Sequence, residues 1–200
     1  MFDLSQLELD IIEWTSVAFN ILFTVLLAKE KRIAWIFGFL GSSLGVAFFF
    51  HYNLIALTIL QVFFAIMGVF GYLNWGRPEL EKVVVKPLKL HIPLILVLAL
   101  IVVITAIPLQ NIMEAEMPYH ETFVAVFSIV ATYLMAWKWL NQWLYWIVID
   151  LVWLWVNIEM GFAAYQILSV TYLLLSVYGY LEWRKQYRLQ LLAEKQVLTD

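Results

Sequence analysis

The chain has 200 residues, of which 64% are hydrophobic and 14% charged, and its formal net charge is −3 at pH 7. This apolar share exceeds the roughly 45–50% of soluble domains and predicts an integral membrane protein with almost no soluble part. The acidic start, MFDLSQLELD, predicts no cleavable signal peptide, and the lack of cysteine excludes disulfides and thiolate metal sites.

Hydrophobic segments along the chain predict seven membrane-spanning helices, each near the roughly 20 residues that a bilayer requires. In chain order they cover 11–28, 33–50, 54–75, 90–110, 119–138, 141–158 and 161–182. All 12 Lys and Arg residues then fall in the first, third and fifth loops or in the C-terminal tail. By the positive-inside rule, this bias places the N-terminus outside and the C-terminus in the cytoplasm of a multi-pass protein of the lipid bilayer.

The two ends of the chain resemble each other, which predicts an internal repeat. Two pairs of strings match at an offset of 108 residues: GYLNW at 71–75 with GYLEW at 179–183, and FNILFTVLLA at 19–28 with FSIVATYLMA at 127–136. The dipeptide Trp-Ile at 35–36 matches 146–147 at an offset of 111, which pairs Asp150 with Phe39. Each half is therefore expected to hold three helices, of which the second is offset by three residues more than the first and third.

All five prolines lie between the two repeats, in or beside the fourth predicted span. The expected organisation is a three-helix repeat at 1–76, a linker with helix four at 77–118, a second three-helix repeat at 119–184 and a cytoplasmic tail at 185–200. One linker helix leaves both repeats in the same orientation. The predicted fold is thus an all-α integral membrane protein with the parallel 3+1+3 architecture of the SWEET sugar carriers.

The sixth predicted span carries the side chains that say most about function. Steps of four, three, four, three and four residues place one stripe on a single helical face: Trp139, Trp143, Trp146, Asp150, Trp153 and Asn157. A carboxylate deep in a membrane span is costly and is a functional-site hypothesis by default. Beside indole faces it suits a flat aromatic cation as the ligand.

The string WLNQWLYWIVID at 139–150 resembles the W-x3-W-x2-W-x3-(N/D) signature of the PnuC family of bacterial vitamin transporters. LQVFF at 60–64, SIVATYLMA at 128–136 and the two GYLNW and GYLEW helix ends extend this resemblance over the whole chain. The resemblance implies facilitated diffusion of a water-soluble B vitamin across the bacterial inner membrane, followed by trapping through cytosolic phosphorylation. It also implies a homo-oligomer.

Thiamine and nicotinamide riboside, two substrates within this family, are both flat aromatic cations. Thiamine is favoured here because its aminopyrimidine offers donors that the Asp150 carboxylate can accept. Nicotinamide riboside is the alternative, since its carriers usually have Asn at the last signature position. The predicted substrate-binding residues are Trp139, Trp143, Trp146, Asp150, Gln61, Asn157, Gln166 and Tyr172.

Other interpretations of the same residues stay open. Tryptophans often form interfacial belts, and Asp150 could instead hydrogen-bond to a neighbouring helix. An intramembrane enzyme would need paired catalytic groups, and a retinal protein would need a lysine within its last span. Neither pattern is present, and there is no P-loop, so we expect no enzyme, cofactor, metal or nucleic-acid partner. A passive channel is the rival that only saturable uptake can distinguish from a carrier.

Overall fold

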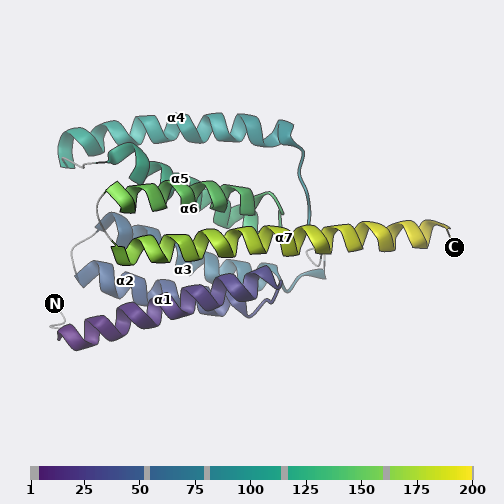
Figure 1. Ribbon diagram of the computed structural model, residues 1–200, viewed down its shortest axis with the longest axis horizontal. Coiled ribbons are helices and arrows are strands. Elements are labelled where there is room, and N and C mark those ends of the chain that lie inside the picture. Colours follow the sequence, from purple (N-terminus) through teal and green to yellow (C-terminus); the bar gives the residue numbers. More distant parts are fainter. Residues whose placement is uncertain (1–4, 52–54, 79–81, 114–116, 160–162, 200) are drawn as a thin grey trace. The chain divides into compact units, whose positions relative to one another are not determined.

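The computed structural model describes residues 5–51, 55–78, 82–113, 117–159 and 163–199, and these residues form seven α-helices (Figure 1). In chain order the helices are α1 (Gln6–Ala28), α2 (Ala34–His51), α3 (Ile55–Asn74), α4 (Leu88–Met113), α5 (Pro118–Ala136), α6 (Gln142–Glu159) and α7 (Ala163–Thr199). The prediction of an all-α protein with seven helices is therefore confirmed. The helix α1 begins earlier than predicted, because Ser5 and Glu8 form a reciprocal capping box at its N-terminus.

Four of the described helices contain segments that are long and apolar enough to cross a membrane: Leu7–Ala28, Ala34–His51, Leu88–Pro108 and Pro118–Ala136. Thr58–Asn74 in α3 is a shorter apolar helix. The helix α6 is less apolar because Gln142, Asp150, Asn157 and Glu159 interrupt its 18 residues. A count of seven spans stays a prediction.

The chain divides into a first unit, Met1–Lys82, and a second unit, Val83–Asp200. In the first unit, α2 packs against both α1 and α3. Glycine allows close approach: a Cβ added at Gly68 of α3 would lie 2.9 Å from the Phe39 backbone of α2. Toward α1, the Ser16 hydroxyl donates to the Gly41 carbonyl at 2.9 Å. Small residues thus allow the middle helix of this unit to pack closely against its neighbours.

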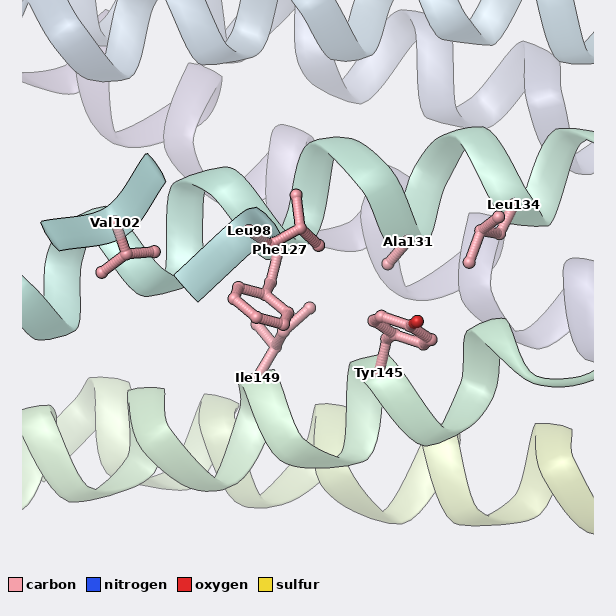
Figure 2. Packing of buried hydrophobic residues seen from close by; sticks show 7 residues of the cluster. All are labelled: Leu98, Val102, Phe127, Ala131, Leu134, Tyr145 and Ile149. Carbon is pink, nitrogen blue, oxygen red and sulfur yellow. The ribbon is translucent and has the colours of Figure 1, made fainter. Parts of the chain in front are cut away.

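In the second unit, the helices α4 to α7 pack in chain order, each against the next. A buried cluster fills the space between α4, α5 and α6 (Figure 2). It consists of Leu98, Val102, Phe127, Ala131, Leu134, Tyr145 and Ile149. The small Ala131 of α5 faces the Tyr145 ring of α6, so that large and small side chains alternate across the contact.

The helix α7 is much longer than predicted. Its 37 residues span about 55 Å at about 1.5 Å per residue, against a hydrocarbon thickness of about 30 Å. Figure 1 shows it as one uninterrupted helix that continues past the ends of α5 and α6. The expected end of the seventh helix near residue 182 is therefore wrong, because the segment expected to be a separate tail continues the same helix.

Two helix boundaries repeat between the two units with an offset of 108 residues. The helices α1 and α5 end at Ala28 and Ala136, and α2 and α6 begin at Ala34 and Gln142. Even the turns agree, since Glu30 and Lys138 both have a φ of 53°. The offset of 111 expected for the Trp-Ile dipeptides is therefore wrong, and Asp150 corresponds to Ser42 rather than to Phe39.

Both turns are Schellman motifs, which explains how two loops of unlike sequence keep one geometry. The backbone N–H of Lys31 donates to the Leu26 carbonyl at 2.9 Å. Its counterpart, the N–H of Trp139, donates to the Leu134 carbonyl at 3.1 Å. These bonds satisfy the last carbonyls of α1 and α5 and require the residue before each donor to adopt the left-handed conformation.

Candidate functional site

The aromatic stripe of α6 begins at Trp143. The helix α6 starts at Gln142, and Trp139 lies in the turn that precedes it. Lys138, with its positive φ, closes the turn after α5, so the four-residue step from Trp139 to Trp143 is not a helical step. The prediction that Trp139 shares the α6 stripe is therefore wrong.

Trp139 instead anchors the segment that leads into α4. Val84 forms a parallel bridge with Trp139. The Lys86 ammonium lies 5.1 Å from an indole centroid, within the range of a cation–π contact, and the His91 ring meets the same indole edge-on at 6.1 Å. His91 Nδ1 in turn lies 2.9 Å from the Tyr145 hydroxyl of α6. These contacts give Trp139 a structural role at the turn, and its part in ligand binding stays a prediction.

Trp143 is 1% exposed and packs between α6 and α7. A Cβ added at Gly179 would lie 2.5 Å from its ring, and Trp183 meets it edge-on with 5.6 Å between ring centroids. Trp35 has the same setting in the first unit, where its centroid lies 5.6 Å from that of Trp75. Because both units contain this arrangement, helix packing accounts for the burial of Trp143 without a ligand.

Asp150 is 7% exposed and lies between α6 and α7. Its Oδ2 accepts a hydrogen bond from the Ser176 hydroxyl at 2.7 Å. Tyr172, four residues before Ser176 on α7, interacts electrostatically with the carboxylate. The structure thus brings two predicted site residues together, and it adds Ser176 as their neighbour.

Asn157 and Gln166 connect α6 to α7 farther along the hairpin. Asn157 Nδ2 donates to Ser169 Oγ at 3.0 Å and to the Trp153 carbonyl at 2.8 Å. Gln166 Nε2 donates to the Asn157 carbonyl at 3.1 Å. These hydrogen bonds show how both amides stabilise the hairpin, while their contact with a ligand stays a prediction.

Trp146 and Gln61 complete the predicted set. Trp146 packs against the cluster of Figure 2, and its buried indole N–H has no hydrogen-bond partner among the described residues. Gln61 lies on α3 of the first unit, where a Cβ added at Gly45 of α2 would be 2.9 Å from its Cδ. The indole N–H of Trp146 is therefore an unpaired donor among the described residues, whereas the Gln61 side chain packs over Gly45.

At the offset of 108, the stripe of α6 replaces a stripe of small residues on α2. The corresponding pairs are Gly38 and Trp146, Ser42 and Asp150, and Gly45 and Trp153. In the first unit, large neighbours fill the space, as Phe23 does 2.9 Å from a Cβ added at Gly38. The counterpart of Phe23 in the second unit is Ala131. In the second unit the large side chains therefore lie on the middle helix. Trp146 and Trp153 form an aromatic wall on α6 around Asp150, and α2 has no acid at the corresponding position.

The sequence pattern did not single out Ser176, although a sign of it was present. Ser169 and Ser176 are seven residues apart on α7, as Asp150 and Asn157 are on α6. Residues with heptad spacing on two antiparallel helices of one hairpin can pair twice along the contact. Reading the two helices together, rather than α6 alone, would have predicted both polar pairs.

These features define a class of protein. The helices are apolar, and Asp150 is the one buried acid among the described residues. No group of three or more His, Asp or Glu suited to a metal ion occurs in the described ranges. A multi-pass membrane protein with one acid on a tryptophan-lined helix fits a carrier of a small polar solute.

Residues 10–185 match the nicotinamide mononucleotide transporter family, and the chain belongs to this family. It is therefore a multi-pass membrane transporter and not an enzyme. A nicotinamide riboside transporter PnuC of Escherichia coli (strain K12) is 25% identical over 72% of this chain and 73% of its own length. A nicotinamide riboside transporter PnuC of Neisseria mucosa is 28% identical over 83% of this chain and 69% of its own length.

The fold is also similar to that of a solved structure, described as the crystal structure of the vitamin B3 transporter PnuC. The TM-score is 0.71 at 21% identity, over 90% of this chain and 83% of that one. At this identity the likeness supports the fold and carries no residue-level role.

Proposed function

We propose that this protein takes up nicotinamide riboside by facilitated diffusion across a bacterial cytoplasmic membrane. The observation that carries the proposal is the similarity to two proteins named nicotinamide riboside transporters, over 72% and 83% of the chain. That similarity favours the riboside over thiamine, which the sequence pattern had placed first. The substrate is a flat aromatic cation in either case.

The proposed binding surface is the aromatic wall of α6 around Asp150. Trp146 would stack on the pyridinium ring, with a cation–π attraction of about 0.5–2 kcal/mol. Asp150 would balance the charge, and Tyr172 on α7 interacts electrostatically with it. Trp143 would support the wall from behind, while Gln61, Asn157 and Gln166 stay candidates for completing the hydrogen bonds.

The proposed membrane arrangement has seven spans, with an outside N-terminus, a cytoplasmic C-terminus and two parallel three-helix repeats joined by α4. Its support is the confinement of all 12 Lys and Arg to the first, third and fifth predicted loops and the C-terminal tail, together with the offset of 108 that relates the ends of α1 and α5, the starts of α2 and α6 and the turns between them. A homo-oligomer is part of the proposal through the family resemblance.

The test is a tryptophan fluorescence titration of the purified protein with nicotinamide riboside and, separately, with thiamine. We expect saturable quenching by the riboside and none by thiamine at equal concentration. Uptake into proteoliposomes should saturate with riboside concentration, which excludes a passive channel. Saturable quenching by thiamine alone would contradict the proposed substrate.

Trp146→Ala should weaken riboside binding by at least about 1 kcal/mol, or roughly fivefold, because a cation–π contact is lost. Trp155→Ala is the matched control. Trp155 lies on the same helix but is 50% exposed, and its indole donates to Glu159 at 3.1 Å. We expect wild-type affinity in the control, measured by the same titration. Wild-type affinity in Trp146→Ala as well would remove Trp146 from the site.

A further inference from the structure

Two polar pairs join α6 and α7, and they differ in chemistry. Asn157 donates to Ser169, a contact between neutral groups, whereas Ser176 donates to the Asp150 carboxylate. When Asp150 is ionised, the second bond is charge-assisted, and such bonds are roughly twice as strong as neutral ones. This hydrogen bond is 2.7 Å long, and the side chains of Ser176 and Asp150 are 4% and 7% exposed. Asp150 is therefore held in one orientation by a specific donor.

The direction of this hydrogen bond leaves the carboxylate with capacity to accept another. An ionised carboxylate accepts only, so the single hydroxyl hydrogen of Ser176 must point at Asp150 Oδ2. Ser176 is the one hydrogen-bond donor to Asp150 among the residues that the structure describes. The other oxygen, Oδ1, accepts no hydrogen bond from the residues that the structure describes, and Tyr172 on α7 is the group that interacts electrostatically with the carboxylate.

The first unit shows that the fold does not need this pair. At the corresponding positions it has Ser42 and Gly68, and a Cβ added at Gly68 would lie 2.9 Å from the Phe39 backbone. There Gly68 of α3 packs against the backbone and Cβ of Phe39 on α2. Because glycine has no side chain, it cannot form a polar pair with Ser42. A bond that served only to join the helices would be expected at the corresponding positions of both units, yet of these positions only Asp150 and Ser176 form it.

We propose that Ser176 is a positioning and specificity-determining residue, which holds the Asp150 carboxylate so that its free oxygen faces the substrate. This inference rests on the proposed function. A fixed anion at this place should accept an amide N–H from the substrate and repel a substrate carboxylate. The pair therefore selects the amide form of a pyridine nucleoside over the corresponding acid.

The experiment compares two variants of equal shape. Ser176→Thr keeps the hydroxyl, and Ser176→Val replaces it with a methyl group of similar volume. Each purified full-length variant is titrated with nicotinamide riboside and with nicotinic acid riboside, which differ only at the carboxamide. We expect Ser176→Val to bind the amide about tenfold more weakly, the scale of a lost hydrogen bond to a charged group. Its preference for the amide over the acid should fall at least about threefold, while Ser176→Thr keeps both values.

The ratio of the two affinities separates positioning from general damage. A purely structural role would weaken both nucleosides equally and leave their ratio unchanged, and this result would overturn the inference. An unchanged affinity and ratio in Ser176→Val would overturn it as well. If the wild-type protein binds neither nucleoside, the proposed function itself fails. Thermal unfolding of all three proteins in detergent confirms that the ratios are measured on folded material.

Discussion

Replacing Gly179 by alanine is expected to destabilise the second unit by about 1–3 kcal/mol, the usual cost of overpacking a buried contact. The added methyl group would lie 2.5 Å from the Trp143 ring, which is far inside van der Waals contact. The ring cannot retreat easily because Trp183 meets it edge-on. Gly71→Ala should act in the same way on the first unit, where the methyl group would overlap the Trp35 ring.

The measurement is the midpoint of thermal unfolding in detergent, compared with a third glycine variant. A Cβ added at Gly76 would lie 2.7 Å from Cζ of Arg32, the far end of a flexible and exposed side chain that can move aside. We therefore expect Gly76→Ala to unfold at nearly the wild-type temperature. Wild-type stability in both Gly71→Ala and Gly179→Ala would show that the Trp–Gly contacts do not hold the helices together.

Apolar segments predicted the helices well because a lipid-compatible chain must satisfy its backbone within each helix. The helix α7 extends beyond its predicted span for a specific reason. After Gly179 the sequence contains no further glycine or proline, so nothing stops the helix as its side chains become charged. The residues from 184 onward include Arg184, Lys185 and Glu194, which favour helix in water. Hydropathy marked the end of the apolar stretch, not the end of the helix.

The offset of the repeat was misread at one dipeptide for a physical reason. Trp-Ile occurs at both 35–36 and 146–147, but identity of two residues carries no information on packing. Trp35 corresponds to Trp143, because each lies over a glycine, Gly71 or Gly179. Each also meets edge-on the tryptophan that follows this glycine by four residues. Trp143, one of the predicted ligand contacts, thus corresponds to a tryptophan that packs in the same way in the first unit.

The acid and its aromatic neighbour were predictable from α6 alone, and their partner was not. Asp150 and Trp146 lie four residues apart on one helix, so a single periodicity brings them together. Ser176 reaches Asp150 from α7, and its register depends on how α6 and α7 pack. Contacts between helices of this kind are decided by side-chain fit, as with Gly179 under Trp143, which one helical pattern does not reveal.

Replacing Asp150 by leucine is expected to cost about 2–5 kcal/mol of riboside binding, or at least about thirtyfold in affinity. The change removes both the charge and the acceptor while keeping the branching of the side chain at Cγ. A cationic substrate would then be desolvated beside tryptophan with no counter-charge. Titration of the purified variant measures the loss, and transport into proteoliposomes should fall with it.

Asp150→Asn separates the charge from the shape. Asparagine keeps one acceptor oxygen, which Ser176 or the substrate can use, but it carries no charge. We expect the affinity for nicotinamide riboside to fall less than in the leucine variant, and any residual affinity for thiamine to be lost first, since thiamine depends on the carboxylate as an acceptor for its amino group. Equal affinities in wild type, Asp150→Asn and Asp150→Leu would place the substrate away from Asp150. In that case the Asp150–Ser176 pair would serve only to join α6 and α7, and Asp150 would have no part in substrate binding.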